Sequence, residues 1–303
     1  MAHTHTHTDS STSATRLFLA ALLNLLITVT QIVGGLLSGS LSLISDALHN
    51  LSDAAAIVIS YIAIKLSGRP NTERYTFGLK RAEILAAILN SGALIGLGVF
   101  LFKAAYDRFM QPEPIAGGLM IIVAVVGLVA NVIGTLLLRQ GAQGNMNIRS
   151  AYLHLLSDTV SSVAIVFGGA AIFWWNIPWI DPLLTVLIAA YIIYESIEIV
   201  KEAVNVLLMG APETVSLQRV QQELEAVPGV QNIHHVHVWR LNEQDIHFEA
   251  HVDVEDMPVS ACQQISKQIE DKLHELYEIT HVTLQFECNR CELKGLVYNH
   301  QHQ

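Results

Sequence analysis

The chain contains six blocks of apolar residues, each about 20 residues long or longer. A helix needs about 20 apolar residues to cross the hydrocarbon core of a bilayer. Only 15% of the residues are charged, whereas an ordinary soluble domain carries about 25%. The sequence therefore predicts a membrane domain over residues 17–209. We expect its six spans at about 17–37, 41–65, 81–106, 115–138, 150–174 and 181–207.

Two of these spans contain the same pair of polar residues. DALHNLSDAAA in the second span carries His49 and Asp53, and HLLSD in the fifth carries His154 and Asp158. Residues four apart lie on one face of a helix, so each span presents one imidazole and one carboxylate together. A charged side chain at the bilayer centre costs roughly 2.5–3.5 kcal/mol, and such residues usually mark an ion path or pair with a partner.

Two such helices facing each other would offer two nitrogen and two oxygen ligands, a set that suits tetrahedral Zn²⁺. An alternative is that the pairs only tie the helices together, for example through His49 and Asp158.

Asp46 lies one turn before His49. It either lines an exit path for the ion or is a solvated residue near the start of its helix. Glu195 and Glu198 in the sixth span face either a dimer seam or a water-filled cavity.

A site of this composition would couple metal movement to proton movement. Imidazole and carboxylate ligands must lose their protons to bind a metal, so metal and protons compete for one site. If the site faces the two sides of the membrane in turn, metal efflux is exchanged for proton influx. The sequence contains neither a GxxxxGK[ST] phosphate loop nor an HExxH metalloprotease motif. We therefore expect a transporter that is not an enzyme.

Charge is distributed unevenly along the chain. Residues 1–209 hold 11 Lys/Arg and 12 Asp/Glu, whereas residues 210–303 hold 6 and 15. An acidic C-terminal part argues against nucleic acid as a partner. Nine basic residues of the membrane domain lie on the side of the two termini, and two lie on the other side. The positive-inside rule then predicts that both termini are cytoplasmic.

Residues 210–291 have the composition of a soluble domain, and residues 292–303 form a short tail. The pattern predicts the order helix, strand, strand, helix, strand. In the strand DIHFEAHVDV, alternation places His247, Glu249, His251 and Asp253 on one face. We interpret His235, His247 and His274 as solvated residues.

The two cysteines of CNRC, Cys288 and Cys291, can supply two of the four ligands that zinc prefers. The missing pair could come from the histidines of the N-terminal segment 1–16, which lies on the same side of the membrane. Alternatively, this segment binds metal loosely by itself and the cysteines are inert. The histidines concerned are His3, His5 and His7.

The motifs SDALHNLSD, HLLSD and RYTFGLKRAE resemble those of the cation diffusion facilitator family, and in particular its zinc-transporting branch. The resemblance covers about Leu17 to Cys291. It implies a six-helix transmembrane domain and a small cytoplasmic α+β domain of the metallochaperone-like, ferredoxin-like kind, assembled as a homodimer. It also implies export of divalent metal from the cytoplasm in exchange for protons, with no organic cofactor. The positions of the family's transport site are matched by His49, Asp53, His154 and Asp158.

The resemblance further implies that Zn²⁺ is the main substrate, often with Cd²⁺ or Co²⁺. His234, His251 and Glu287 match positions that bind metal in the cytoplasmic domain of relatives, where zinc would regulate transport. Some relatives combine a C-terminal CxxC with the N-terminal segment of the neighbouring subunit.

Two loops depart from patterns seen in relatives. The loop SGRPNTERYTFG has Glu73 as its only acidic residue and no histidine, so we expect no metal site there. The loop RQGAQGNMN is short, which favours a bacterial protein of the inner membrane. A membrane-bound metal sensor without transport is the alternative function, although it leaves the paired His and Asp residues without a purpose.

Overall fold

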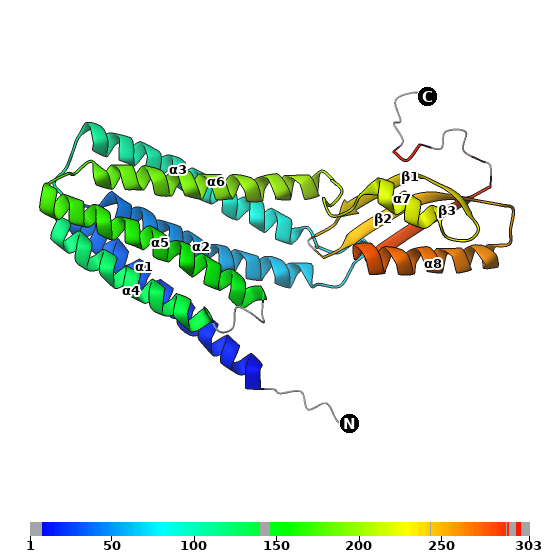
Figure 1. The fold of residues 1–303 in the computed structure, drawn as a ribbon, viewed down its shortest axis with the longest axis horizontal. Helices are drawn as coiled ribbons and strands as arrows, with labels where there is room; N and C mark the ends of the chain where they lie inside the picture. Colours follow the sequence, from blue (N-terminus) through cyan, green and yellow to red (C-terminus); the bar gives the residue numbers. More distant parts are fainter. Residues whose placement is uncertain (1–7, 140–145, 243, 289, 291–294, 298–303) are drawn as a thin grey trace. The chain divides into compact units, whose positions relative to one another are not determined.

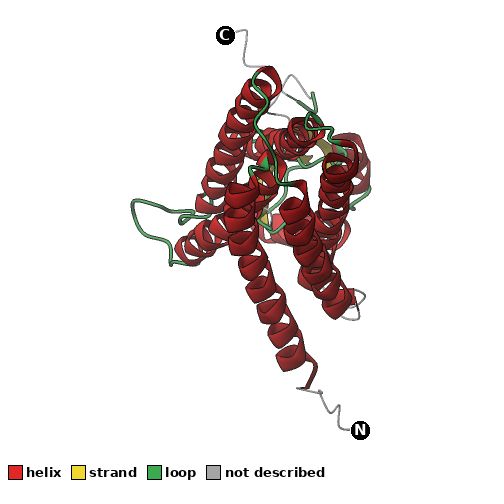
Figure 2. Ribbon diagram, turned by 90° about the vertical axis from the view of Figure 1, so that its left-hand side faces the viewer, coloured by secondary structure: helices red, strands yellow, loops and turns green. Residues whose placement is uncertain are grey.

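The computed structural model describes the chain except residues 1–7, 140–145, 243, 289, 291–294 and 298–303 (Figure 1). It divides into two compact units. The first contains Met1–Tyr61 and Leu89–Ile199, and the second contains Ile62–Ile88 and Val200–Gln303. Helices make up most of the chain (Figure 2), and the strands form one small sheet.

A long helix lies at each of the six predicted spans. Five are long and apolar enough to cross a membrane, judged over the residues that the structure describes. In the first helix, the described apolar segment is Leu22–Ser38, which is shorter than the other five. The helices are α1 (Thr8–Ser38), α2 (Leu41–Ser67), α3 (Ala82–Met110), α4 (Gly117–Arg139), α5 (Met146–Trp175) and α6 (Ile180–Leu207).

Apolar side chains cover much of the outer surface of these helices, as expected where lipid replaces water. Phe167 is 71% exposed and Phe100 is 61% exposed. The interior of the first unit is held by a small cluster of side chains from α2, α4 and α5, which positions α2 beside α5. Its buried members are Leu43, Met120, Val123, Ala124, Ile165 and Ile172.

The start of α2 is fixed by a carboxylate from α6. Asp181 is fully buried. Its Oδ1 accepts hydrogen bonds from the hydroxyls of Ser40 (2.7 Å) and Ser42 (2.6 Å) and from the Ser42 backbone N–H (3.2 Å). Its Oδ2 accepts one from the Leu41 N–H (2.7 Å). The bonds from the Leu41 and Ser42 N–H groups satisfy two of the backbone donors that the first turn of a helix leaves without intrahelical partners.

The second unit has the predicted order of elements. It contains α7 (Leu217–Glu225), β1 (Val230–Arg240), β2 (Ile246–Val254), α8 (Val259–Tyr277) and β3 (His281–Glu287). The sheet order is β1-β2-β3, in which β1 and β2 are antiparallel and β2 and β3 are parallel. A ferredoxin-like fold has the order β-α-β-β-α-β, with one more strand than the described residues form. The ferredoxin-like detail therefore stays a prediction.

One face of the sheet packs on the two helices and the other carries the polar residues. On β2, Phe248, Ala250 and Val252 belong to the core that also contains Leu224 of α7 and Ile269 of α8. The residues between them point to the opposite face, as the alternation predicted.

His247 on this polar face is buried, so its interpretation as a solvated residue is wrong. Its ring stacks on Trp239 of β1 with the centroids 5.3 Å apart. Phe77, from the segment between α2 and α3, packs edge-on against it at 5.4 Å. Lys80 of the same segment pairs with Asp245 at 3.3 Å. The cause is long-range packing within the second unit, which a strand pattern does not reveal.

The environment of His247 should make this part of the structure sensitive to pH. Burial, and then the nearby His281, lower its pKa from the ordinary value of 6.5, while Asp245 opposes them. The unfolded chain therefore binds a proton more readily than the folded one. The stability that neutral His247 contributes to the fold is present above about pH 6.5. It is lost as the pH falls through the lowered pKa of the folded state.

We expect His247→Phe, which keeps the stacking, to reduce this loss. The measurement is hydrogen exchange of strand β2 at pH 7.5 and 5.5, corrected for intrinsic rates. An equal drop in protection in both proteins would contradict this role of His247.

Candidate functional site

The four ligands that the sequence predicted in the membrane spans lie close together. Asp53 Oδ2 on α2 is 3.5 Å from Nε2 of His49 and 3.5 Å from Nε2 of His154 on α5. Asp158 Oδ2 is 3.6 Å from Nε2 of His154. The centroids of the two imidazole rings are 6.3 Å apart. Thus α2 and α5, which run side by side (Figure 1), bring both sequence pairs to one place.

The separations between these atoms suit a metal. Ligand atoms about 2.0–2.2 Å from a tetrahedral Zn²⁺ are roughly 3.3–3.6 Å from one another. The measured separations of 3.5, 3.5 and 3.6 Å fall in this range. A direct hydrogen bond would draw the atoms to about 2.7–3.2 Å. The geometry therefore favours a ligand set over the alternative that the pairs only tie the two helices together.

Several buried polar atoms of the site have no hydrogen-bond partner among the described residues. His49 Nδ1, Asp53 Oδ2 and Asp158 Oδ2 are buried and accept or donate no hydrogen bond within the described part of the chain. A buried polar atom without a partner costs about 1–3 kcal/mol. A cation between the side chains would give both carboxylate oxygens a partner.

Asp46 is not a solvated residue, because α1 and α5 cover it. Its side chain is 2% exposed. Its Oδ2 accepts a hydrogen bond from Gln31 Nε2 of α1 at 2.6 Å, and its Oδ1 accepts one from Ser161 Oγ of α5 at 3.0 Å. Asp46 therefore joins three helices one turn from His49. Its role in an exit path stays a prediction.

A cavity of about 240 Å³ opens beside the membrane site. It is lined by His49 of α2, by Ser157, Asp158 and Ser161 of α5, and by Tyr191 of α6. Its remaining walls are apolar. Two of the four candidate ligands are thus reached from this cavity.

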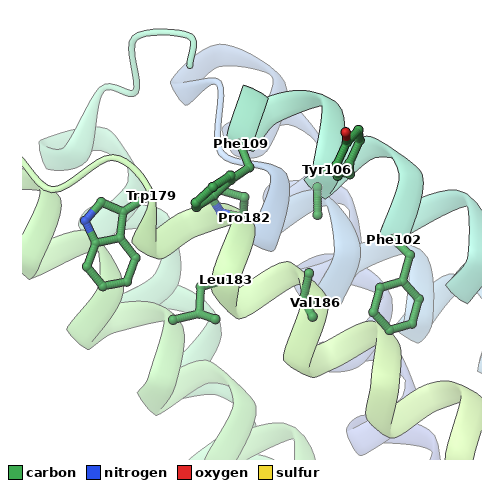
Figure 3. Close-up of a pocket in the computed structure, with 8 residues that line it drawn as sticks. Phe102, Tyr106, Phe109, Trp179, Pro182, Leu183 and Val186 are labelled. Carbon is green, nitrogen blue, oxygen red and sulfur yellow. The ribbon is translucent and has the colours of Figure 1, made fainter. Parts of the chain in front are cut away.

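A larger cavity of about 670 Å³ lies between α3 and α6 (Figure 3). Its lining is aromatic and aliphatic, and includes Phe102, Phe109, Trp179 and Leu183. None of the residues described as lining it is a histidine, carboxylate or cysteine. It has no groups that could hold a metal ion.

A second group of candidate ligands lies on the polar face of the sheet. His234 of β1 and His251 of β2 are direct neighbours in the strand register, and Glu287 ends β3. Glu287 Oε2 is 3.5 Å from His234 Nε2, and Glu287 Oε1 is 3.0 Å from His251 Nδ1. One ligand atom of each residue lies within 4.8 Å of the others. Two imidazoles and a carboxylate at this spacing fit a zinc ion with one further position open.

The orientation of His234 is set by two residues that no sequence pattern distinguishes. Its Nδ1 is 3.1 Å from the amide oxygen of Asn232. The amide nitrogen of Asn232 donates to Glu225 Oε1 at 3.0 Å, which fixes the direction of the amide. The Nδ1 of His234 therefore carries the proton, and Nε2 keeps its lone pair toward Glu287. Such outer hydrogen bonds hold metal-binding histidines in the required tautomer.

The remaining predicted ligands are only partly described. Cys288 is exposed and has a free thiol. Cys291, His3, His5 and His7 lie outside the described residues. Their joint metal site stays a prediction.

Comparison with known proteins identifies both parts of the chain. Residues 17–208 match the cation efflux transmembrane domain, and residues 212–288 match the cytoplasmic domain of cation efflux proteins. The zinc transporter ZitB of Pectobacterium atrosepticum is 37% identical over 96% of this chain and 91% of its own length.

Two further bacterial relatives have broader names. The metal cation efflux system protein CzcD of Cupriavidus metallidurans is 35% identical over 96% of this chain and 91% of its own length. A cadmium, cobalt and zinc/H⁺-K⁺ antiporter of Bacillus subtilis is 34% identical over 86% of this chain and 84% of its own. The chain therefore belongs to the cation efflux family, whose members are multi-pass membrane transporters of metal ions.

Proposed function

We propose that the protein exports Zn²⁺ from the cytoplasm in exchange for protons, and that His49, Asp53, His154 and Asp158 bind the transported ion. The observation that carries this proposal is the convergence of two imidazoles and two carboxylates from α2 and α5. Relatives named as zinc, cadmium and cobalt transporters support the choice of a divalent metal. The site also admits Cd²⁺ and Co²⁺, because one N₂O₂ set binds several of these ions.

Competition at the site supplies the exchange mechanism. A divalent ion binds the deprotonated imidazoles and carboxylates, and protons displace it from the same atoms. When the site faces the cytoplasm, zinc enters and protons leave. When it faces the other side, protons bind and zinc leaves. The free energy of the proton gradient thus drives the metal outward.

We further propose that the protein is a homodimer in the bacterial inner membrane with both termini in the cytoplasm. The excess of basic residues on the side of the termini supports this orientation. We assign residues 1–16 to the N-terminal segment, 17–209 to the membrane domain, 210–291 to the cytoplasmic domain and 292–303 to the tail. On this assignment α1 also crosses the membrane, which brings the number of spans to six.

The test is Zn²⁺ flux in proteoliposomes that contain the purified protein and carry an imposed pH gradient. Export by exchange requires flux that reverses direction when the gradient is reversed. Zinc binding without any flux, with Zn²⁺, Cd²⁺ or Co²⁺, would favour the membrane-bound sensor instead.

Regulatory zinc would be held by the cytoplasmic cluster. His234, His251 and Glu287 fit a zinc ion, which would tie the three strands of the sheet together. Zinc at 100 times its dissociation constant should stabilise this part of the fold by about 2.7 kcal/mol.

We expect zinc to slow hydrogen exchange in β1 and β3 of the intact protein, and a chelator to reverse the effect. Glu287→Gln should remove most of this protection, because it removes the carboxylate that contacts both imidazoles. His274→Ala, at an exposed position of α8, is the matched control. Equal protection in Glu287→Gln and the unmodified protein would exclude this metal site.

A further inference from the structure

Two polar side chains of α6, those of Tyr191 and Glu195, lead from the cavity beside the membrane site toward the C-terminal end of the helix. The hydroxyl of Tyr191 donates a hydrogen bond of 2.6 Å to Glu195 Oε1. Ser157 Oγ of α5 lies 3.2 Å from the same hydroxyl. Tyr191 is therefore held from both sides, and it holds Glu195 in turn.

Tyr191 connects this pair to the candidate ligands. It lines the cavity of about 240 Å³ that His49 and Asp158 also line. The other α6 residues in the lining are Leu184, Leu187 and Ile188, which offer an ion no ligand atom. On the α6 side of the cavity, a cation thus meets one polar group, and that group is bonded to a carboxylate.

The position of Glu195 is unusual for a structural residue. It lies in the interior of α6, a helix apolar enough to cross the membrane, and is exposed on its surface. Carboxylates in such helices are costly and generally mark the route of an ion. Glu195 is one turn nearer than Tyr191 to Leu207, the C-terminal end of α6. With the termini in the cytoplasm, this is the cytoplasmic side of the cavity.

We propose that Glu195 is a transient binding site for the divalent cation on its way from the cytoplasm to His49 and Asp158, and that Tyr191 positions it. A single exposed carboxylate binds a divalent ion weakly and releases it quickly, as an access site must. Its negative charge raises the local cation concentration at the cavity. The inference rests on the proposed function, because it assumes that the ion travels to the membrane site.

The test compares Glu195→Gln with Glu198→Gln in the full-length protein. Glu198→Gln removes the same charge one turn further along α6, at another exposed position. The probe is Co²⁺, whose visible absorption reports tetrahedral binding. The part of the signal that Asp53→Ala abolishes belongs to the membrane site.

We expect Glu195→Gln to slow Co²⁺ association with the membrane site about tenfold, since charges that steer an ion change association rates by about 10–1,000-fold. The final absorption spectrum should be unchanged, because the four ligands remain. Tyr191→Phe should slow association less, since the carboxylate stays but loses its support. In flux assays, Glu195→Gln should raise the KM for Zn²⁺ about tenfold and leave the maximal rate unchanged.

Equal association rates in Glu195→Gln and Glu198→Gln would overturn the proposal. A lower maximal rate with an unchanged KM and association rate would also overturn it, because Glu195 would then carry protons rather than the cation. The association measurement needs no transport. Slower association in Glu195→Gln therefore supports the access site even if the intact protein moves no zinc, a result that would refute the proposed function alone.

Discussion

Asp53→Ala and His154→Ala should each reduce proton-driven Zn²⁺ flux by at least about 100-fold. Asp53 Oδ2 lies 3.5 Å from an imidazole nitrogen on each of the two helices, so its loss removes the ligand that joins the two pairs. His154 is the residue that contacts both carboxylates. Changes outside the ligand set of a zinc site already cost about 10–100-fold in affinity, and the loss of a ligand costs more.

The measurement is initial flux at several Zn²⁺ concentrations, together with Co²⁺ absorption as a measure of binding. Asp107→Ala and His274→Ala remove the same residue types at exposed positions and should transport normally. If Asp53→Ala or His154→Ala moves zinc at the rate of these controls, the paired residues are structural and the ion crosses by another route.

The membrane ligands could be predicted from the sequence because their arrangement depends on local geometry. The spacing of His49 and Asp53 fixes their shared helix face, and His154 and Asp158 repeat it. One further assumption, that the two faces meet, was enough to predict the cluster that the structure contains. The order of elements in the soluble domain could likewise be predicted from alternation and helical periodicity.

Contacts between distant segments could not be predicted in this way. Asp46 is buried because Gln31 and Ser161 approach it from two other helices, and neither residue has a distinctive sequence context. His247 is buried because Phe77 reaches it from a segment about 170 residues earlier in the chain. Both cases depend on which elements pack together, and a single periodic pattern contains no such information. The cytoplasmic cluster of His234, His251 and Glu287 was expected from family resemblance alone, and not from the spacing of its residues.

The glycines of the membrane helices show the same limit. Small residues in spans allow helices to pack closely. An added Cβ at Gly34 would clash with Val123, and one at Gly168 would clash with Leu184. At Gly92 and Gly96, the described residues leave open space instead. Whether a glycine is required at a given position therefore depends on which side chains of the neighbouring helices approach it.

Asp181→Ala should destabilise the membrane domain by roughly 2–6 kcal/mol, since the backbone N–H groups of Leu41 and Ser42 each cost about 1–3 kcal/mol when left without a partner. The substitution removes four acceptor interactions at once. Ser40 and Ser42 are fully buried, so water cannot readily replace the carboxylate. The change should lower the midpoint of thermal unfolding in detergent. Asp181→Asn should have a smaller effect, because an amide oxygen can still accept from the backbone donors of α2.

Asp107→Ala is the matched control for this effect. It removes a carboxylate that makes only a long contact of 3.9 Å with Lys103, with both side chains exposed. Such surface pairs contribute little, so its unfolding midpoint should stay near that of the unmodified protein. The cap lies two turns before His49, and its loss should therefore also weaken Co²⁺ binding while all four ligands remain. An unfolding midpoint for Asp181→Ala equal to that of Asp107→Ala would show that α2 is held in place by its apolar packing against α4 and α5 alone.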